Sequence, residues 1–283
     1  MARFDWYQGT VPADVGPLLA SLEGVAEAFG RWEPITRAPH GYADGRRLVD
    51  ADGLCAQVWW GGMHERPHVV SSGEMAPWVA AALREHWPGH TVSRADVCED
   101  YAEPGAYERM QGLALEVARD KRVKVGTAGD HLLTHRGRTL YLGARSSHTR
   151  LRLYDKADEL REQFARDPVR LSEVPVELAR LEVQVRPHTP EAKAAAAKVE
   201  PMALMGSAAW TRELMRLVAG LELEPFEAGR PWRQADDDRA YAALLSQYGG
   251  LLDRVYGDLG SWDMVGRQIG HDLAERRAAK GRR

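Results

Sequence analysis

Tyr154 lies in a segment whose neighbours could turn it into a nucleophile. It stands between two cations in the run Arg152-Leu153-Tyr154-Asp155-Lys156. A phenol with a pKa of about 10 reacts slowly until positive charge or a metal stabilises its phenolate. Arg152 and Lys156 could supply that charge. The segment therefore predicts a tyrosine that attacks a phosphodiester, with Arg152 and Lys156 assisting.

Carboxylates occur in two other segments that alternate polar and apolar residues, Arg94–Asp100 and Arg180–Arg186. A period of two predicts strands, with Asp96 and Asp100 on one face of the first and Glu182 on one face of the second. Carboxylate oxygens suit Mg²⁺ or Mn²⁺, which would polarise a phosphodiester. Each strand alone is more simply an amphipathic strand with a solvated face. Three such strands together, one carrying a tyrosine beside cations, favour a functional site.

Positive charge is concentrated around this tyrosine. The whole chain has a net charge of −3. Residues 119–156 hold ten Lys or Arg and three acids, so this window carries +7 and the remainder −10. A basic block in an acidic protein is typical of a local phosphate-binding surface, although charge alone fits a solvated face equally well. The candidate DNA contacts are Lys121, Arg122, Lys124, Arg145 and Arg150 of this block, and Arg186 of the third strand segment.

Hydrophobic periodicity predicts the elements that must position these residues. Expected strands are 3–10, 54–60, 67–72, 91–101, 131–135, 138–144, 148–155 and 176–186. Expected helices are 13–30, 76–87, 105–121, 156–166, 189–198, 207–220, 237–257 and 261–279. The stretch 126–129 reads as a turn. The pattern favours an α+β fold: a duplicated antiparallel sheet with helices packed on one face, plus a C-terminal helical region. The parts are a first α+β half (1–103), a second half carrying the tyrosine (104–206) and the helical region (207–283).

Composition excludes several classes of protein. The 283 residues are 44% hydrophobic and 28% charged, which is ordinary for a globular chain. No run of 18 apolar residues predicts a membrane span, and the N-terminus lacks the apolar stretch of a secretion signal. Two cysteines, Cys55 and Cys98, cannot form a disulfide framework or a CxxC zinc motif. We expect a cytoplasmic protein.

Several motifs together resemble the replication initiation factor family of filamentous phages and small rolling-circle plasmids, which also includes relaxases of some conjugative elements. The strongest motif is Arg152-x-Tyr154-Asp155-Lys156-x-x-Glu159, and the others lie in the order that the family has. They are Phe4-Asp5-Trp6-Tyr7, Arg94-x-Asp96-x-x-x-Asp100, Leu142-Gly143-x-Arg145-Ser146 and Arg180-x-Glu182-x-Gln184-x-Arg186. The resemblance spans residues 3–186, and residues 207–283 match no motif of the family.

The resemblance implies a metal-dependent DNA-nicking enzyme with Tyr154 as its nucleophile. The cut strand would become joined to Tyr154 through a 5′-phosphotyrosyl bond. Mg²⁺ or Mn²⁺ would be held by Asp96 and Glu182, with Asp100 and Glu159 as further candidates. Some relatives have a second acid where this chain has Gln184, so a site that needs that acid would be incomplete. The family also implies an origin DNA partner, single-stranded or supercoiled duplex, together with a host helicase and a homodimer.

Three functions stay open at this point. The first is a rolling-circle replication initiator that nicks and rejoins one strand at an origin. The second is a conjugative relaxase with the same chemistry. The third is a non-catalytic regulator that binds DNA on the same scaffold without nicking it.

Overall fold

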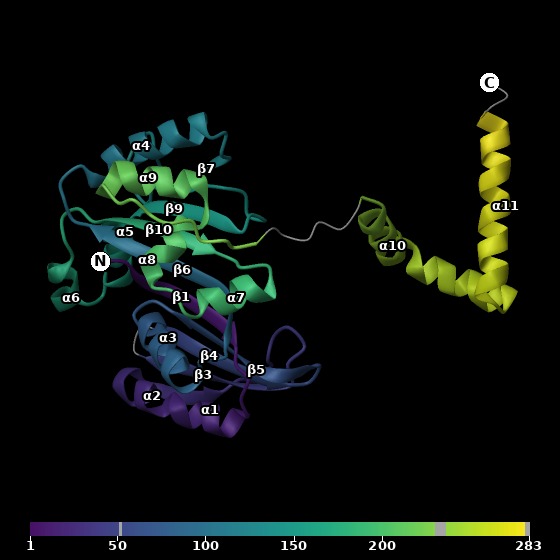
Figure 1. The fold of residues 1–283 in the computed structure, drawn as a ribbon, viewed down its shortest axis with the longest axis horizontal. Coiled ribbons are helices and arrows are strands. Elements are labelled where there is room, and N and C mark those ends of the chain that lie inside the picture. Colours follow the sequence, from purple (N-terminus) through teal and green to yellow (C-terminus); the bar gives the residue numbers. More distant parts are fainter. Residues whose placement is uncertain (51–52, 230–235, 281–283) are drawn as a thin grey trace. The chain divides into compact units, whose positions relative to one another are not determined.

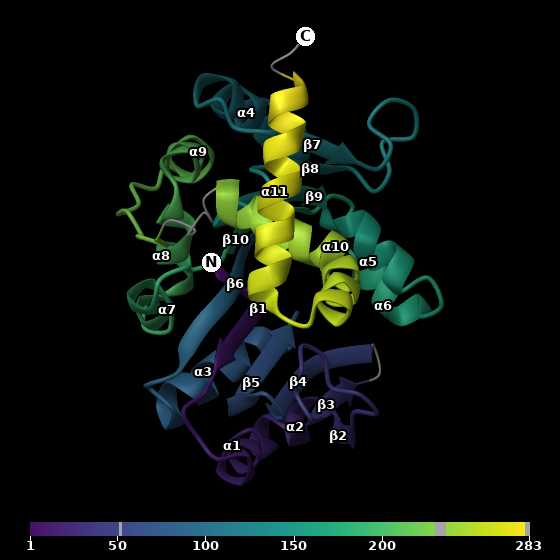
Figure 2. The same ribbon diagram turned by 90° about the vertical axis from the view of Figure 1, so that its right-hand side faces the viewer.

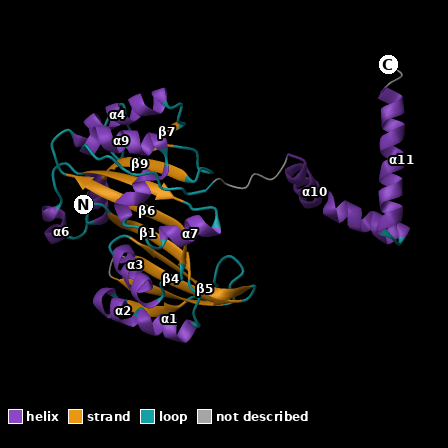
Figure 3. Ribbon diagram, viewed as in Figure 1, coloured by secondary structure: helices purple, strands orange, loops and turns teal. Residues whose placement is uncertain are grey.

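A ten-stranded antiparallel sheet forms the centre of the protein (Figure 3). The structure is a computed structural model that describes residues 1–50, 53–229 and 236–280. The strand order is β2-β3-β4-β5-β1-β6-β10-β9-β8-β7. The chain folds as two compact units, Met1–Pro231 and Trp232–Arg283, and the sheet lies in the first.

The first half of the sheet comes from residues 1–101 (Figure 1). Its elements are β1 (Arg3–Thr10), α1 (Val15–Ser21), α2 (Glu23–Phe29), β2 (Arg31–Pro34), β3 (Asp44–Asp50), β4 (Gly53–Gly61), β5 (His64–Ser72), α3 (Met75–His86) and β6 (Thr91–Tyr101). The strand β1 pairs with β5 on one side and β6 on the other, so the N-terminal residues lie at the middle of the sheet.

The second half repeats the order of a strand meander, helices and a central strand. Its elements are α4 (Ala106–Asp120), β7 (Val125–Ala128), β8 (Thr139–Leu142), β9 (Thr149–Asp155), α5 (Lys156–Gln163), α6 (Pro168–Glu173) and β10 (Ala179–Val185). The helices α7 (Pro190–Ala196), α8 (Pro201–Leu204) and α9 (Ala209–Ala219) follow, with a 3₁₀ turn at Met205–Ser207. Pairing of β10 with β6 joins the two halves into one continuous sheet.

The two faces of the sheet differ because side chains alternate along each strand. Val97, Leu151, Leu153, Leu181 and Val183 are buried in the hydrophobic core on one face. The helices α3, α4 and α7 contact β1, β9 and β6 respectively and cover this face. Figure 2 shows α7, α8 and α9 on one side of β6 and β10, with α5 and α6 on the other. The face beside α5 and α6 carries the polar side chains, and we call it the open face.

The second unit consists of two helices, α10 (Asp236–Leu259) and α11 (Trp262–Lys280). The Tyr256 and Trp262 rings stack at the turn between them, with centroids 4.9 Å apart. The chain turns between the two helices at Gly260, whose φ of 75° suits glycine. None of the described helices combines the length and the apolar character that crossing a bilayer requires.

The α+β class is confirmed, with a large antiparallel sheet and a C-terminal helical region. Two strands, β2 and β3, were not predicted. The expected strand 131–135 is wrong. That segment is a loop because the Asp130 carboxylate accepts hydrogen bonds from the backbone N–H groups of Leu132, Leu133 and Thr134. The neighbouring stretch expected to be a turn forms β7 instead.

The division of the chain also differs from the expected one at its C-terminal end. We expected a helical region from residue 207, whereas α9 packs on α4 within the first unit and the second unit begins at Trp232. The amphipathic pattern of α9 predicts a helix, but it does not specify which part of the protein covers the apolar side of that helix. It is therefore equally consistent with packing on α4 and with a separate C-terminal region.

Replacement of Leu153 by alanine should destabilise the protein strongly. Leu153 is fully buried between the sheet and its helices, so Leu153→Ala should lower the free energy of unfolding by about 2–5 kcal/mol. Urea denaturation would measure the change. Leu132→Ala is the matched control, because Leu132 is 87% exposed and its loss should change the stability by less than about 0.5 kcal/mol. Equal effects of the two changes would contradict the assignment of the core face.

Candidate active site

Tyr154 lies on the open face of the sheet, under two cations. The Arg152 guanidinium Cζ lies 4.3 Å from the centre of the Tyr154 ring and the Lys156 Nζ lies 5.9 Å from it. Arg180 is its register partner on β10. The tyrosine is 5% exposed, but its surroundings are charged side chains. It is therefore buried within a polar cluster and not in the apolar core.

The end of β9 determines where these groups point. The Asp155 carboxylate accepts a hydrogen bond from the Asp158 N–H and caps the first turn of α5. The Lys156 N–H donates to the Leu178 carbonyl at 2.7 Å, which ties this turn to the segment before β10. Lys156 pairs with Glu159 at 2.8 Å, one turn further along α5. A strand that changes directly into a capped helix thus places Lys156 beside Tyr154.

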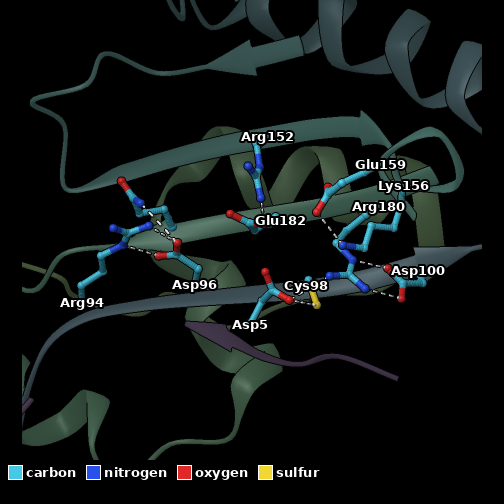
Figure 4. A network of polar contacts seen from close by, with 11 residues as sticks. Asp5, Arg94, Asp96, Cys98, Asp100, Arg152, Lys156, Glu159, Arg180 and Glu182 are labelled. Carbon is cyan, nitrogen blue, oxygen red and sulfur yellow. Dashed lines mark hydrogen bonds and ion pairs between the residues drawn. The ribbon is translucent and has the colours of Figure 1, made fainter. Parts of the chain in front are cut away.

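The predicted metal ligands Asp96 and Glu182 are close neighbours on adjacent strands. Glu182 lies opposite Cys98 and Gln184 opposite Asp96, so the two carboxylates are diagonal neighbours on the open face. Asp96 is 2% exposed and Glu182 6%. Each acid has its own arginine, as Figure 4 shows: Arg94 Nε donates to Asp96 at 2.9 Å and Arg152 Nη2 to Glu182 at 2.6 Å.

Gln184 takes part in this arrangement as a hydrogen-bond donor. Its Nε2 donates to Asp96 Oδ2 at 3.3 Å. It thus occupies the position where some relatives have a second acid, and it satisfies Asp96 instead of adding a carboxylate.

Asp5 is a member of the site that the sequence analysis did not assign. It accepts a hydrogen bond from Arg180 Nη1 at 2.8 Å, and the Cys98 thiol points toward it at 3.9 Å. Asp100 accepts from the same Arg180 at 2.6 Å and from Arg3 at 2.7 Å. Arg180 therefore joins acids from β1 and β6 (Figure 4). The Phe4-Asp5-Trp6-Tyr7 motif was the available signal for Asp5.

Burial and neighbouring charges shift the pKa values of the two groups on which the chemistry depends. Burial raises the pKa of the Tyr154 hydroxyl, and Arg180 and Arg152 offset this only in part. Burial also raises the pKa of Glu182, to about 7. Arg152 opposes that shift, whereas Asp96 and Asp5 add to it by repulsion. The negative charges of Asp5, Asp96 and Glu182 therefore repel one another on the open face.

The acids of the open face offer the kind of ligand atoms that a hard divalent cation prefers. Asp5, Asp96 and Glu182 offer only carboxylate oxygens, and their mutual repulsion is what a cation would relieve. In the part of the chain that the structure describes, no three acidic, histidine or cysteine side chains come close enough to hold a metal. Each of these acids forms an ion pair with an arginine in the structure. The oxygen donors are of the type that such a cation takes, but the acids would have to come closer together, in place of the guanidinium groups, to share one cation.

A groove of about 670 Å³ runs over these residues. Its lining includes six of the predicted site residues: Asp96, Asp100, Arg152, Lys156, Glu159 and Glu182. The strands β4 and β5 border it near Cys55 and Ser72, and α5 and α6 border it near Phe164 and Arg170. A polymer could therefore pass across the acids and arginines of the open face.

The predicted DNA contacts fall into two groups. Arg150 lies on β9 and faces the open side, whereas Arg186 directly follows β10 and its Nη1 donates to the Arg145 carbonyl at 3.1 Å. Lys121 caps the C-terminus of α4, which packs on α9 over the core face, and Arg122 follows it. Lys124 precedes β7, where its carbonyl accepts a hydrogen bond from Gly143. The roles of all six residues stay predictions.

Loss of the Arg180 guanidinium should destabilise the sheet. Arg180 is buried and neutralises Asp5 and Asp100, so Arg180→Gln leaves two carboxylates without their main cation. Removing one partner of a buried ion pair typically costs about 3–5 kcal/mol. Urea denaturation would measure the loss. Arg119→Gln, at an exposed position of α4, is the control and should leave stability nearly unchanged. A stable Arg180→Gln protein would show that water can solvate these acids.

The fold is similar to that of a protein of known structure. The rolling circle replication initiator protein from Geobacillus stearothermophilus matches with a TM-score of 0.51 at 18% sequence identity, and the match covers 84% of this chain and 90% of that chain. No protein-family model matches the sequence, and no curated protein matches it. At this identity the similarity establishes the arrangement of strands and helices.

Proposed function

We propose that this protein is a rolling-circle DNA replication initiator that nicks and rejoins one DNA strand through Tyr154. The observation that carries the proposal is the position of Tyr154 on the same face as Asp96 and Glu182, with arginines between them. This set combines a nucleophile, phosphate-binding groups and metal-binding oxygens. The likeness in fold to a replication initiator supports the same kind of function.

The proposed reaction is a transesterification at one phosphodiester. The Tyr154 Oη attacks the phosphorus, an O–P bond to the tyrosine forms, and the P–O3′ bond breaks. The phenol releases its proton and the departing 3′ oxygen takes one up. The number of ester bonds at phosphorus is unchanged, so the reverse attack by a 3′-OH can rejoin the strand.

The side chains around Tyr154 have separable roles in this proposal. Arg152 and Arg180 stabilise the phenolate, because they are the two cations whose charge lowers the pKa of Tyr154 against the effect of burial. Arg152 also holds Glu182, so a phosphate that attracts Arg152 would free that carboxylate. Asp96 and Glu182, with Asp5, would hold Mg²⁺ or Mn²⁺, which when bound supplies charge neutralisation at the phosphodiester. Asp100, held by Arg3 and Arg180, would serve to position Arg180.

Tyr154→Phe should abolish nicking and leave DNA binding intact. The change removes one oxygen and preserves the ring against which Arg152 packs. The substrate would be supercoiled plasmid carrying the DNA that flanks the protein's own gene, incubated with Mn²⁺. The wild-type chain should give relaxed circles and a covalent protein–DNA adduct, and the variant neither.

A matched control is Tyr107→Phe, because the Tyr107 ring also packs against an arginine, Arg138, but lies on α4 and does not line the groove. Relaxation and adduct formation by Tyr154→Phe would refute the tyrosine mechanism. Sequence-specific DNA retention by the wild-type chain without any nicking would instead favour the non-catalytic regulator. A nick at a conjugative transfer origin would favour the relaxase.

Asp96→Asn and Glu182→Gln should each reduce nicking by at least about a hundredfold while DNA binding changes little. Both substitutions preserve shape and can still accept a hydrogen bond from the partner arginine, but they remove charge that a cation needs. Nicking rates and filter binding of the same DNA would be compared. Glu103→Gln is the control, because Glu103 pairs with Arg109 outside the groove. Parallel loss of binding and nicking would show that the acids are structural.

The homodimer and the host helicase stay predictions.

A further inference from the structure

The arginines of the open face differ in whether an acid neutralises them. Arg94, Arg152 and Arg180 each pair with a carboxylate. Arg150 lies further along the same face, and Arg145 and Arg186 lie close enough to act on it electrostatically. No carboxylate pairs with these three arginines among the described residues. We call these three residues the arginine cluster. Arg150 and Arg186 are half-buried and Arg145 is exposed, so like charges are held close together without a compensating acid, and a bound anion would relieve their repulsion.

Arg150 is the central member of the arginine cluster. Its Cζ lies 4.1 Å from the centre of the Tyr141 ring, and its Nε is buried with no hydrogen-bond partner. Burial lowers the pKa of Arg150, and so does repulsion from Arg145, Arg186 and Arg152. The ring therefore holds the guanidinium in place, and no acid of the described residues pairs with its outer Nη groups, which could bind a ligand.

Positive charge extends beyond the arginine cluster toward the start of α7. Burial lowers the pKa of His188, and repulsion from His148, Lys193 and Arg186 lowers it further. The His188 Nε2 is also buried without a partner. The groups gathered here are thus hydrogen-bond donors and cations, which is the donor set that phosphate oxygens accept.

The position of the arginine cluster relates it to the nucleophile. Arg150 and Tyr154 lie on one face of β9, four residues apart, which corresponds to about 13 Å along a strand. Gln184 lies opposite Arg150 and hydrogen-bonds Asp96, so the face is continuous from the acids to the cluster. A DNA strand with a phosphate at Tyr154 could therefore present another phosphate, a few nucleotides away, to Arg150.

We propose that Arg145, Arg150 and Arg186 form a phosphodiester-binding subsite that anchors single-stranded DNA a few nucleotides from the phosphate attacked by Tyr154. The inference rests on the proposed function for its substrate. A single strand is favoured over a duplex because the Tyr141 and Trp6 rings, under Arg150 and Arg94, lie on the same face and could stack on unpaired bases. The anchor would hold the cut strand by its backbone, independently of the covalent bond.

Binding of a fluorescent oligothymidylate of about twenty nucleotides would test the anchor. The full chain carrying Tyr154→Phe would be used without metal, so that no cleavage step enters the measurement. Arg150→Gln and Arg186→Gln should each weaken binding roughly tenfold at low salt. Each should also reduce the slope of log K against log salt concentration by about 0.7 per lost phosphate contact. Arg150→Lys keeps the charge without the planar guanidinium, so its affinity for the oligonucleotide should lie between that of the Tyr154→Phe parent and that of Arg150→Gln.

The matched control is Arg119→Gln, which removes one positive charge from the helix-covered face and should change binding less than about twofold. Thermal unfolding of each variant would show that the fold is intact. Unchanged affinity and slope in Arg150→Gln and Arg186→Gln, or no binding of the oligonucleotide, would overturn the anchor. So would tighter retention of a duplex of equal length, or full displacement of the oligonucleotide by inorganic phosphate at matched ionic strength. Loss of nicking in the earlier experiments would leave these binding results unaffected, so the two proposals fail separately.

Discussion

The pairing of buried charges across the central strands is the constraint that organises this protein. Arg180 on β10 reaches across β6 and holds acids from β6 and β1 at the same time. An isolated charge at such a depth would cost several kcal/mol, so each acid requires a cation close by. The strand order places β1 and β10 on either side of β6, which makes this bridging possible. The site and the middle of the sheet are therefore stabilised by the same interactions.

The same pairing explains why the candidate nucleophile is covered. Arg152 binds Glu182 and packs on the ring of Tyr154, so one guanidinium neutralises an acid and shields a phenol. Arginine is also the side chain best suited to bind phosphate in two-pronged geometry. DNA phosphates would therefore compete with these carboxylates for the same arginines. Among the described residues no acid pairs with Arg145, Arg150 or Arg186, so the proposed subsite could take a phosphate without first losing an internal ion pair.

The separation of the sheet into two faces makes this chemistry compatible with stability. Leu151, Leu153, Leu181 and Val183 fill the core under α4 and its neighbours, so the apolar driving force is confined to one side. The other side can then carry charge without weakening the core. The helices α5 and α6 border the groove on the open face, and α5 starts directly after Asp155, which caps it. The helix that borders the groove is thus positioned by the strand that carries the nucleophile.

Local pattern alone was enough to predict much of this arrangement. Alternation in 149–155 and 180–186 identified two strands and the residues that share a face, because side-chain direction along a strand has a fixed period. The order of strands in the sheet could not be read from the pattern, since register and neighbours depend on contacts between residues far apart in the chain. Asp5 therefore came to the site only through the placement of β1, and the pairing of each acid with its own arginine emerged only in the folded sheet. The segment 131–135 is a loop and not the expected strand, because the Asp130 carboxylate, and not a strand ladder, accepts its backbone N–H groups. Residue type and spacing determined which side chains are candidates for the site. Tertiary structure decided which arginine pairs with which acid, because a buried charge without a partner is too costly.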